Sequence, residues 1–202
     1  VVELLQRANE LITQANNGTH DKDHRQDLGE EIDILVERLF TISESKFGSF
    51  HLFSGTKSDT PPYTEARDPI TNRITGVTAT LDGDTTQRKT QINENTVLEY
   101  GELANGADGL FENGGSVDMF GNLLAMRDEL LLGNIPVDTD MSELEDNLDH
   151  AIGHLTQNGV EQQLLEAQDE SLQNSETVQV QQLENLQAAD LAASMTDLSQ
   201  LQ

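Results

Sequence analysis

The sequence predicts a mainly α-helical protein in which a β-rich insert separates two groups of helices. Three observations lead to this fold class. Apolar residues recur at helical spacing near both ends of the chain, an alternating apolar pattern occupies the middle, and glycine-rich turn sequences surround that pattern. We expect residues 1–56 and 118–202 to form an elongated antiparallel helical bundle, and residues 57–117 to form a small β domain.

Two helices are expected in the N-terminal part of the chain. An apolar stripe with steps of 4, 3 and 4 positions comprises Leu4, Ala8, Leu11 and Ala15, and Asn16-Asn17-Gly18 is a sequence that ends helices. A stronger stripe with steps of 4, 3, 4 and 3 comprises Leu28, Ile32, Leu35, Leu39 and Ile42. Such heptad spacing is typical of a helix packed along other helices.

Further helices are expected towards the C-terminus. A short one runs from about Met119 to Leu132, and Ser142-x-x-Glu145 predicts a capping box that begins the next. Its packing seam comprises Leu144, Leu148, Ala151 and Leu155, and Leu165 and Leu172 continue in the same phase. A separate last helix is predicted from Leu183, Leu186, Leu191, Met195 and Leu198.

The middle of the chain has the pattern of β structure. Apolar and polar residues alternate from Ile74 to Leu81, as in a half-buried strand. Asp82-Gly83 is a hairpin signal, so the segment from Thr85 to Ile92 is predicted to be the partner strand. Further turns are expected at Asn105-Gly106 and Asn113-Gly114-Gly115.

Charge and composition exclude several classes of protein. The 202 residues include 37 acidic and 11 basic side chains, which gives a net charge of −26 and argues against nucleic-acid binding. No apolar run approaches the roughly 18 residues of a membrane span. Since cysteine is absent, disulfides, zinc ribbons and thiol catalysis are excluded. Every Lys and Arg precedes position 128, so the rest of the chain is acidic and rich in Gln.

No catalytic, cofactor-binding or metal-binding residue is assigned from the sequence. His150 and His154 share a helix face, but no Glu follows the first histidine as it does in zincins, so we interpret them as surface histidines. Asp82-Gly83-Asp84 and Asp138-Thr139-Asp140 both lack the Gly and Glu positions of an EF-hand loop. No nucleophile elbow or phosphate-binding glycine motif is present either.

Short motifs resemble a known family. Between positions 48 and 63 they comprise Gly48, Phe50, Leu52, Phe53, Gly55, Thr56, Pro62 and Tyr63, and further matches are Gly83, Asp84, Phe111, Asp190, Leu191 and Ala192. This pattern resembles the flagellar hook-associated protein 3 family, also called hook–filament junction proteins, of the flagellin-like superfamily. Ala188 and Ala193 depart from it, because the family usually has acids at these two positions.

The resemblance implies a non-enzymatic structural adaptor with a flagellin-like rod domain. It would be extracellular, exported by the flagellar secretion apparatus, and would form a layer of copies at the hook–filament junction. The implied partners are the first hook-associated protein, flagellin and an export chaperone. Because helical patterns reach both Val1 and Gln202, we expect a trimmed core whose terminal helices continue beyond this sequence. The alternatives are a flagellin filament subunit and an acidic halophile or calcium-binding surface module.

Overall fold

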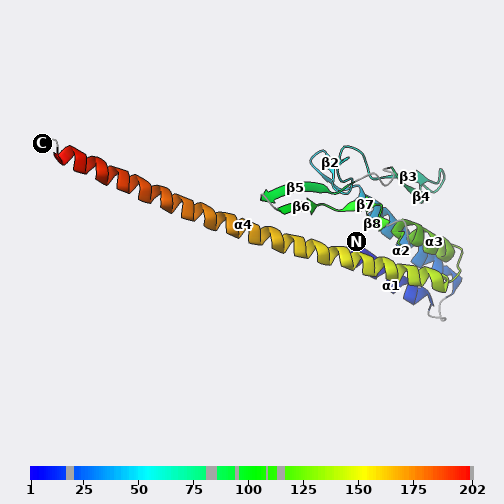
Figure 1. The fold of residues 1–202 in the computed structure, drawn as a ribbon. Helices are drawn as coiled ribbons and strands as arrows, with labels where there is room; N and C mark the ends of the chain where they lie inside the picture. The colour runs from blue at the N-terminus through cyan, green and yellow to red at the C-terminus, as the bar shows by residue number, and fades with distance from the viewer. Residues whose placement is uncertain (17–20, 81–85, 94–95, 108, 113–116, 201–202) are drawn as a thin grey trace. The chain divides into compact units, whose positions relative to one another are not determined.

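The computed structural model describes residues 1–16, 21–80, 86–93, 96–107, 109–112 and 117–200 (Figure 1). Its helices are α1 (Val2–Asn16), α2 (Lys22–Ser43), α3 (Met119–Leu131) and α4 (Asp138–Gln200). Its strands are β1 (Lys46–Phe47), β2 (Phe50–His51), β3 (Tyr63–Arg67), β4 (Ile74–Ala79), β5 (Arg88–Asn93), β6 (Thr96–Tyr100), β7 (Leu103–Asn105) and β8 (Gly109–Glu112). The protein is therefore mainly helical with small sheets, as predicted.

The chain divides into two units, Val1–Thr156 and Gln157–Gln202. The first unit contains α1, α2, α3, all eight strands and the beginning of α4. The second unit is the remainder of α4, and no side chain described in it is buried. The apolar side chains that the structure describes in this unit are exposed, and they include Leu165, Leu172, Leu183, Leu186 and Leu191.

The first helices form where the apolar spacing predicts them. α1 buries a stripe that is wider than the predicted one, because Leu5 and Ile12 join it. α2 begins at an N-cap, where the Asp21 carboxylate accepts a hydrogen bond of 2.9 Å from the backbone N–H of His24. Within α2, Leu28, Ile32, Leu35 and Leu39 are buried and Ile42 is half-buried. Asn17 and Gly18 of the predicted helix end lie outside the described residues.

Two predictions for the C-terminal part are wrong. The helix begins at Asp138 and not at the Ser142 capping box, since its first turn already forms after Val137, whose carbonyl accepts a hydrogen bond of 3.0 Å from the backbone N–H of Asp140. α4 then continues without a break to Gln200, so the separate last helix does not exist. The helix contains no proline, and Gly153 and Gly159 lower its helical propensity without breaking it.

The predicted hairpin between residues 74–81 and 85–92 is also wrong. β4 pairs antiparallel with the preceding β3, and β5 pairs antiparallel with the following β6. The turn between β3 and β4 starts at Asp68, whose Oδ1 accepts hydrogen bonds from the backbone N–H groups of Ile70 (2.9 Å) and Thr71 (2.7 Å). This Asp-Pro turn closes the hairpin earlier than Asp82-Gly83, which lies outside the described residues together with Asn113-Gly114-Gly115.

The chain between α2 and α3 carries all the strands, and we call it the strand segment. Aromatic residues of this segment pack against the helices. The Phe111 ring lies 5.2 Å from the ring of Phe53 and 5.8 Å from that of Phe120 on α3, between ring centres. The Tyr63 ring lies 5.1 Å from that of Phe120, and its hydroxyl donates to the Ala104 carbonyl at 2.9 Å. One hydrophobic core therefore includes residues from α1, α2, α3 and the strands. None of the helices in the described part of the chain is long and apolar enough to cross a membrane.

Candidate functional site

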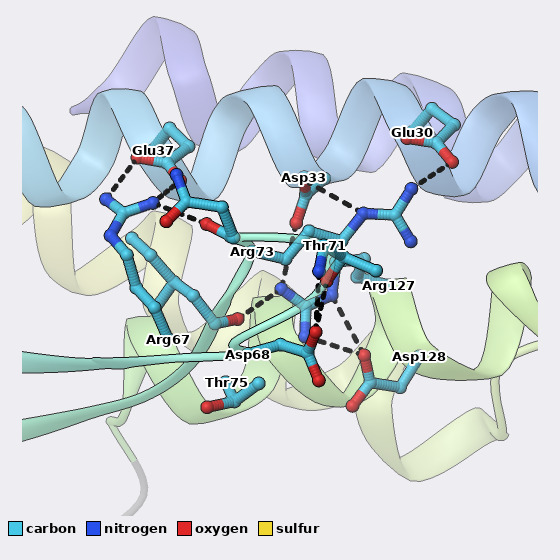
Figure 2. Close-up of polar contacts among 12 residues, drawn as sticks. Glu30, Asp33, Glu37, Arg67, Asp68, Thr71, Arg73, Thr75, Arg127 and Asp128 are labelled. Carbon is cyan, nitrogen blue, oxygen red and sulfur yellow. Dashed lines mark hydrogen bonds and ion pairs between the residues drawn. The ribbon is translucent and has the colours of Figure 1, made fainter.

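Three acidic residues on one face of α2 bind three arginines (Figure 2). Glu37 forms a bidentate pair with Arg67, with N–O distances of 2.6 and 2.9 Å. Figure 2 shows Glu30 and Asp33, which precede Glu37 on the same helix, both facing Arg73. Arg67 ends β3 and Arg73 directly precedes β4, so these pairs attach both ends of the β3–β4 turn to α2.

Arg127 is the buried centre of this network. Its Nη1 donates to Asp33 Oδ1 at 2.9 Å and to the carbonyl of Ile74 at 2.5 Å, and its Nη2 donates to Asp128 at 2.7 Å. One α3 side chain therefore joins α2, α3 and the start of β4. The pairs with Glu37 and then Glu65 raise the pKa of Arg67, so this arginine stays charged. We call Glu30, Asp33, Glu37, Arg67, Arg73 and Arg127 the arginine network.

The arginine network was not predicted from the sequence. A signal exists in the spacing of Glu30, Asp33 and Glu37, which places three carboxylates on one side of α2. The arginines that bind them come from segments more than 25 residues further along the chain. The β3–β4 pairing determines which arginine meets which carboxylate. This pairing was itself predicted incorrectly.

The motif residues after α2 form a compact turn region. Gly55 has a φ of 51°, and a Cβ on it would lie 2.5 Å from the Thr86 carbonyl oxygen and 2.7 Å from a methyl of Leu103. The Thr56 amide donates to the Thr86 carbonyl at 3.2 Å, and Arg88 donates to the Gly55 carbonyl at 2.9 Å. Only glycine fits this position, because both the backbone conformation and the space exclude a side chain.

Other motif residues are exposed at the β1–β2 hairpin. Phe47 and Phe50 face each other in the strand register and are 79% and 53% exposed. Gly48, between them, has a φ of 64°, which the tight turn requires. Leu52 is exposed as well, so three large apolar side chains are exposed in and directly after this hairpin. We call Phe47, Phe50 and Leu52 the hairpin patch.

The remaining predicted residues are distributed over the chain. Phe53 is half-buried, Pro62, Tyr63 and Phe111 are buried, and Gly83 and Asp84 lie outside the described residues. In α4, Leu144 is buried, Leu148 is half-buried, and Leu155 is 61% exposed. Asp190 and Ala192 are exposed in the second unit. The motif positions therefore divide between a packed turn region, the hairpin patch and an exposed helix.

The interpretation of His150 and His154 as surface histidines is wrong. Both are half-buried, and their two Nε2 atoms lie 3.1 Å apart. His150 Nε2 also lies 2.9 Å from the carbonyl oxygen of Gly109, and His154 Nδ1 lies 2.7 Å from the carboxylate of Glu102. Their i, i+4 spacing indicated a shared helix face, but not that the strand segment covers it.

The fold defined by these elements is that of flagellar hook-associated proteins. No family model and no curated protein matches the sequence. Flagellar hook-associated protein 3 from Legionella pneumophila matches with a TM-score of 0.72 and 12% identity, over 92% of this chain and 88% of the other. The resemblance predicted from the sequence is thus confirmed for the fold.

Two further solved structures share the fold. A putative flagellar hook-associated protein from Vibrio parahaemolyticus matches with a TM-score of 0.64 and 16% identity, over 84% of this chain and 73% of the other. FlgL from Xanthomonas campestris matches with a TM-score of 0.53 and 13% identity, over 86% of this chain and 88% of the other. The similarity is therefore in backbone arrangement, with few identical residues.

Proposed function

We propose that this chain is a non-enzymatic structural adaptor of the bacterial flagellum that acts at the hook–filament junction. The observation that carries the proposal is the shared fold, which covers nearly the whole chain and nearly the whole hook-associated protein 3 of Legionella pneumophila. The protein is proposed to be exported, to form a layer with copies of itself, and to contact the first hook-associated protein on one side and flagellin on the other.

Two surfaces support a role in assembly. The second unit is a helix whose leucines are all exposed where the structure describes them, and apolar side chains on a helix are stabilised when other helices cover them. The hairpin patch is a separate apolar surface on the first unit. We assign the helix to packing with neighbouring terminal helices, and the hairpin patch to contact with an adjacent subunit.

The motif residues take structural roles in this proposal. The Gly55 turn and the Tyr63–Phe111 packing hold the strand segment on the helices, and the arginine network fixes the β3–β4 hairpin. Residues 57–117 are proposed to form the part of the molecule that faces outward. The heptad residues of α2 and α4 are proposed to form the rod that stacks in the assembly.

Deletion of the gene that encodes this chain tests the proposal. We expect hooks without filaments, and flagellin monomer shed into the medium, because flagellin would have no surface on which to polymerise. Absence of both filaments and shed flagellin would contradict the junction role and indicate flagellin itself. Unchanged filaments and swimming would contradict both and favour an acidic surface module.

The hairpin patch can be tested in the deleted strain. A double variant, Phe47→Ala with Phe50→Ala, is expected to be exported normally but to restore few filaments, since both rings are exposed in the single chain. Ile70→Ala is the control, because Ile70 is also exposed but lies in the β3–β4 turn. Full restoration of filaments by the double variant would show that the hairpin patch is not an assembly contact.

A further inference from the structure

Two histidines on successive turns of α4 direct the same nitrogen atom towards one point. His150 and His154 have their Nε2 atoms 3.1 Å apart, with ring centres separated by 4.5 Å. Two imidazole nitrogens on one ion, with bonds of about 2.0–2.1 Å and an angle of roughly 90–109°, lie about 2.9–3.4 Å apart. The observed separation falls in this range, and it is also that of a hydrogen bond between the two rings when no metal is bound.

Glu102 orients the ring of His154, one of these two histidines. Its Oε2 lies 2.7 Å from His154 Nδ1, so the ring donates its Nδ1–H to the carboxylate. This tautomer leaves the lone pair of Nε2 directed towards His150. A carboxylate behind a histidine is the usual outer shell of a metal ligand, because it orients the ring and increases its basicity. The side chains of Glu102 and His154 are 15% and 18% exposed, so the contact is partly shielded from solvent.

A backbone carbonyl borders the same point. The oxygen of Gly109, the first residue of β8, lies 2.9 Å from His150 Nε2 and accepts its N–H when no metal is bound. Among the described residues, no group of three or more His, Cys, Asp or Glu side chains could hold a metal ion. The histidine pair supplies two of the four ligands of a tetrahedral site, so water and this carbonyl would have to supply the other two.

We propose that His150 and His154 bind one divalent ion of the zinc class, with Glu102 as the carboxylate that positions His154. Imidazole ligands favour Zn²⁺, Ni²⁺ and Cu²⁺ over Mg²⁺ and Ca²⁺, which prefer oxygen. The ion would lie between α4 and the segment that carries Glu102 and Gly109, all within the first unit. Zinc would thus fasten the β7–β8 segment to the helix and stabilise the folded chain.

The test is a calorimetric titration of the full chain with Zn²⁺. Because a chain of charge −26 attracts cations weakly at many sites, the titration contains a large excess of Mg²⁺ to occupy these. We expect one strong Zn²⁺ site in the native protein, and loss of this site in His154→Gln. Glu102→Gln retains both ligands and is expected to lower the affinity about tenfold, the usual effect of losing an outer-shell partner.

A second histidine pair supplies the control. His20→Gln with His24→Gln removes two histidines at the same sequence spacing and is expected to leave the strong site unchanged. Circular dichroism confirms that each variant is folded, and a rise in melting temperature with Zn²⁺ should occur in the native protein but not in His154→Gln. Absence of the strong site, or a strong site that persists in the doubly substituted His150→Gln with His154→Gln, overturns the proposal.

Discussion

Arg127 on α3 donates a hydrogen bond of 2.9 Å to Asp33 on α2, and only 3% of the arginine is exposed to solvent. The same guanidinium donates to the Ile74 carbonyl, so one buried cation holds two helices and a strand. A buried ion pair is stable only when its hydrogen bonds are satisfied. Here they are, because Asp33 also lies near Arg73 and Arg127 also binds Asp128.

Replacing Arg127 should therefore destabilise the fold strongly. Arg127→Met leaves Asp33 with one distant cation and the Ile74 carbonyl without its donor, so we expect a loss of about 3 kcal/mol in the free energy of unfolding. Arg7→Met is the control, since Arg7 forms exposed ion pairs with Glu10 and Glu31, and a much smaller loss is expected. Urea unfolding of both variants measures the difference, and equal losses would contradict the role of Arg127.

The Tyr63 hydroxyl is a second buried contact that can be removed alone. It donates to the Ala104 carbonyl, and burial raises its pKa, so it remains a donor throughout the neutral range. Tyr63→Phe should cost about 1 kcal/mol, the usual value of such a hydrogen bond. Tyr100→Phe is the matched control, because Tyr100 is 39% exposed, and it should leave the unfolding midpoint unchanged. If Tyr63→Phe leaves the free energy of unfolding unchanged, the contact does not hold β3 in place.

Glu112 should make stability depend on pH. Burial, and then the negative charge of Asp118, raise the pKa of its carboxyl in the folded state. The folded protein therefore holds this proton more tightly than the unfolded chain, and its contribution to stability falls as pH rises through the raised pKa. Glu112→Gln should be more stable than the native protein at pH 7, and this advantage should shrink as pH approaches 4.

Melting temperatures at several pH values measure this effect. Glu145→Gln is the control, because Glu145 is exposed on α4 and its replacement should change stability by less than about 0.5 kcal/mol. If Glu112→Gln were no more stable than the native protein at pH 7, the ionised Glu112 carboxylate would not be unfavourable in the fold.

Salt should stabilise both the single chain and its assemblies. A net charge of −26, with no base after Arg127, brings like charges within a Debye length of about 8 Å at physiological salt, and more ions screen their repulsion. We expect the melting temperature, and the size of assemblies measured by sedimentation, to rise from low to molar NaCl. A melting temperature that stays constant or falls would show that charge repulsion does not determine the stability of the chain.

Local periodicity predicted most of the helical structure. The steps of 4 and 3 positions from Leu28 to Ile42 predicted α2, and the apolar run from Phe120 to Leu131 predicted α3. The length of α4 was not predicted, because the residues from Leu183 to Leu198 were predicted to form a separate helix. Helical propensity stabilises α4 even in its C-terminal part, where no described side chain is buried.

Contacts between distant segments could not be predicted in the same way. The choice of β3 as the partner of β4 depends on the Asp68 turn, which competes with the hairpin signal at Asp82-Gly83. The arginine network and the contact between Glu102 and His154 join residues 30 or more positions apart, and no local pattern specifies such pairs. The sequence motif included Gly55, whereas the turn at this position and its steric reason became evident only with Thr86 and Leu103 in place.

The measurement that tests the central proposal most directly is immunogold labelling of intact flagella with an antibody against this chain. A junction protein should be labelled only in a short band where the filament meets the hook, and the label should disappear in the deleted strain. Labelling along the whole filament would contradict the junction role and identify a filament subunit. Labelling elsewhere on the cell surface, with none on flagella, would contradict the flagellar account altogether.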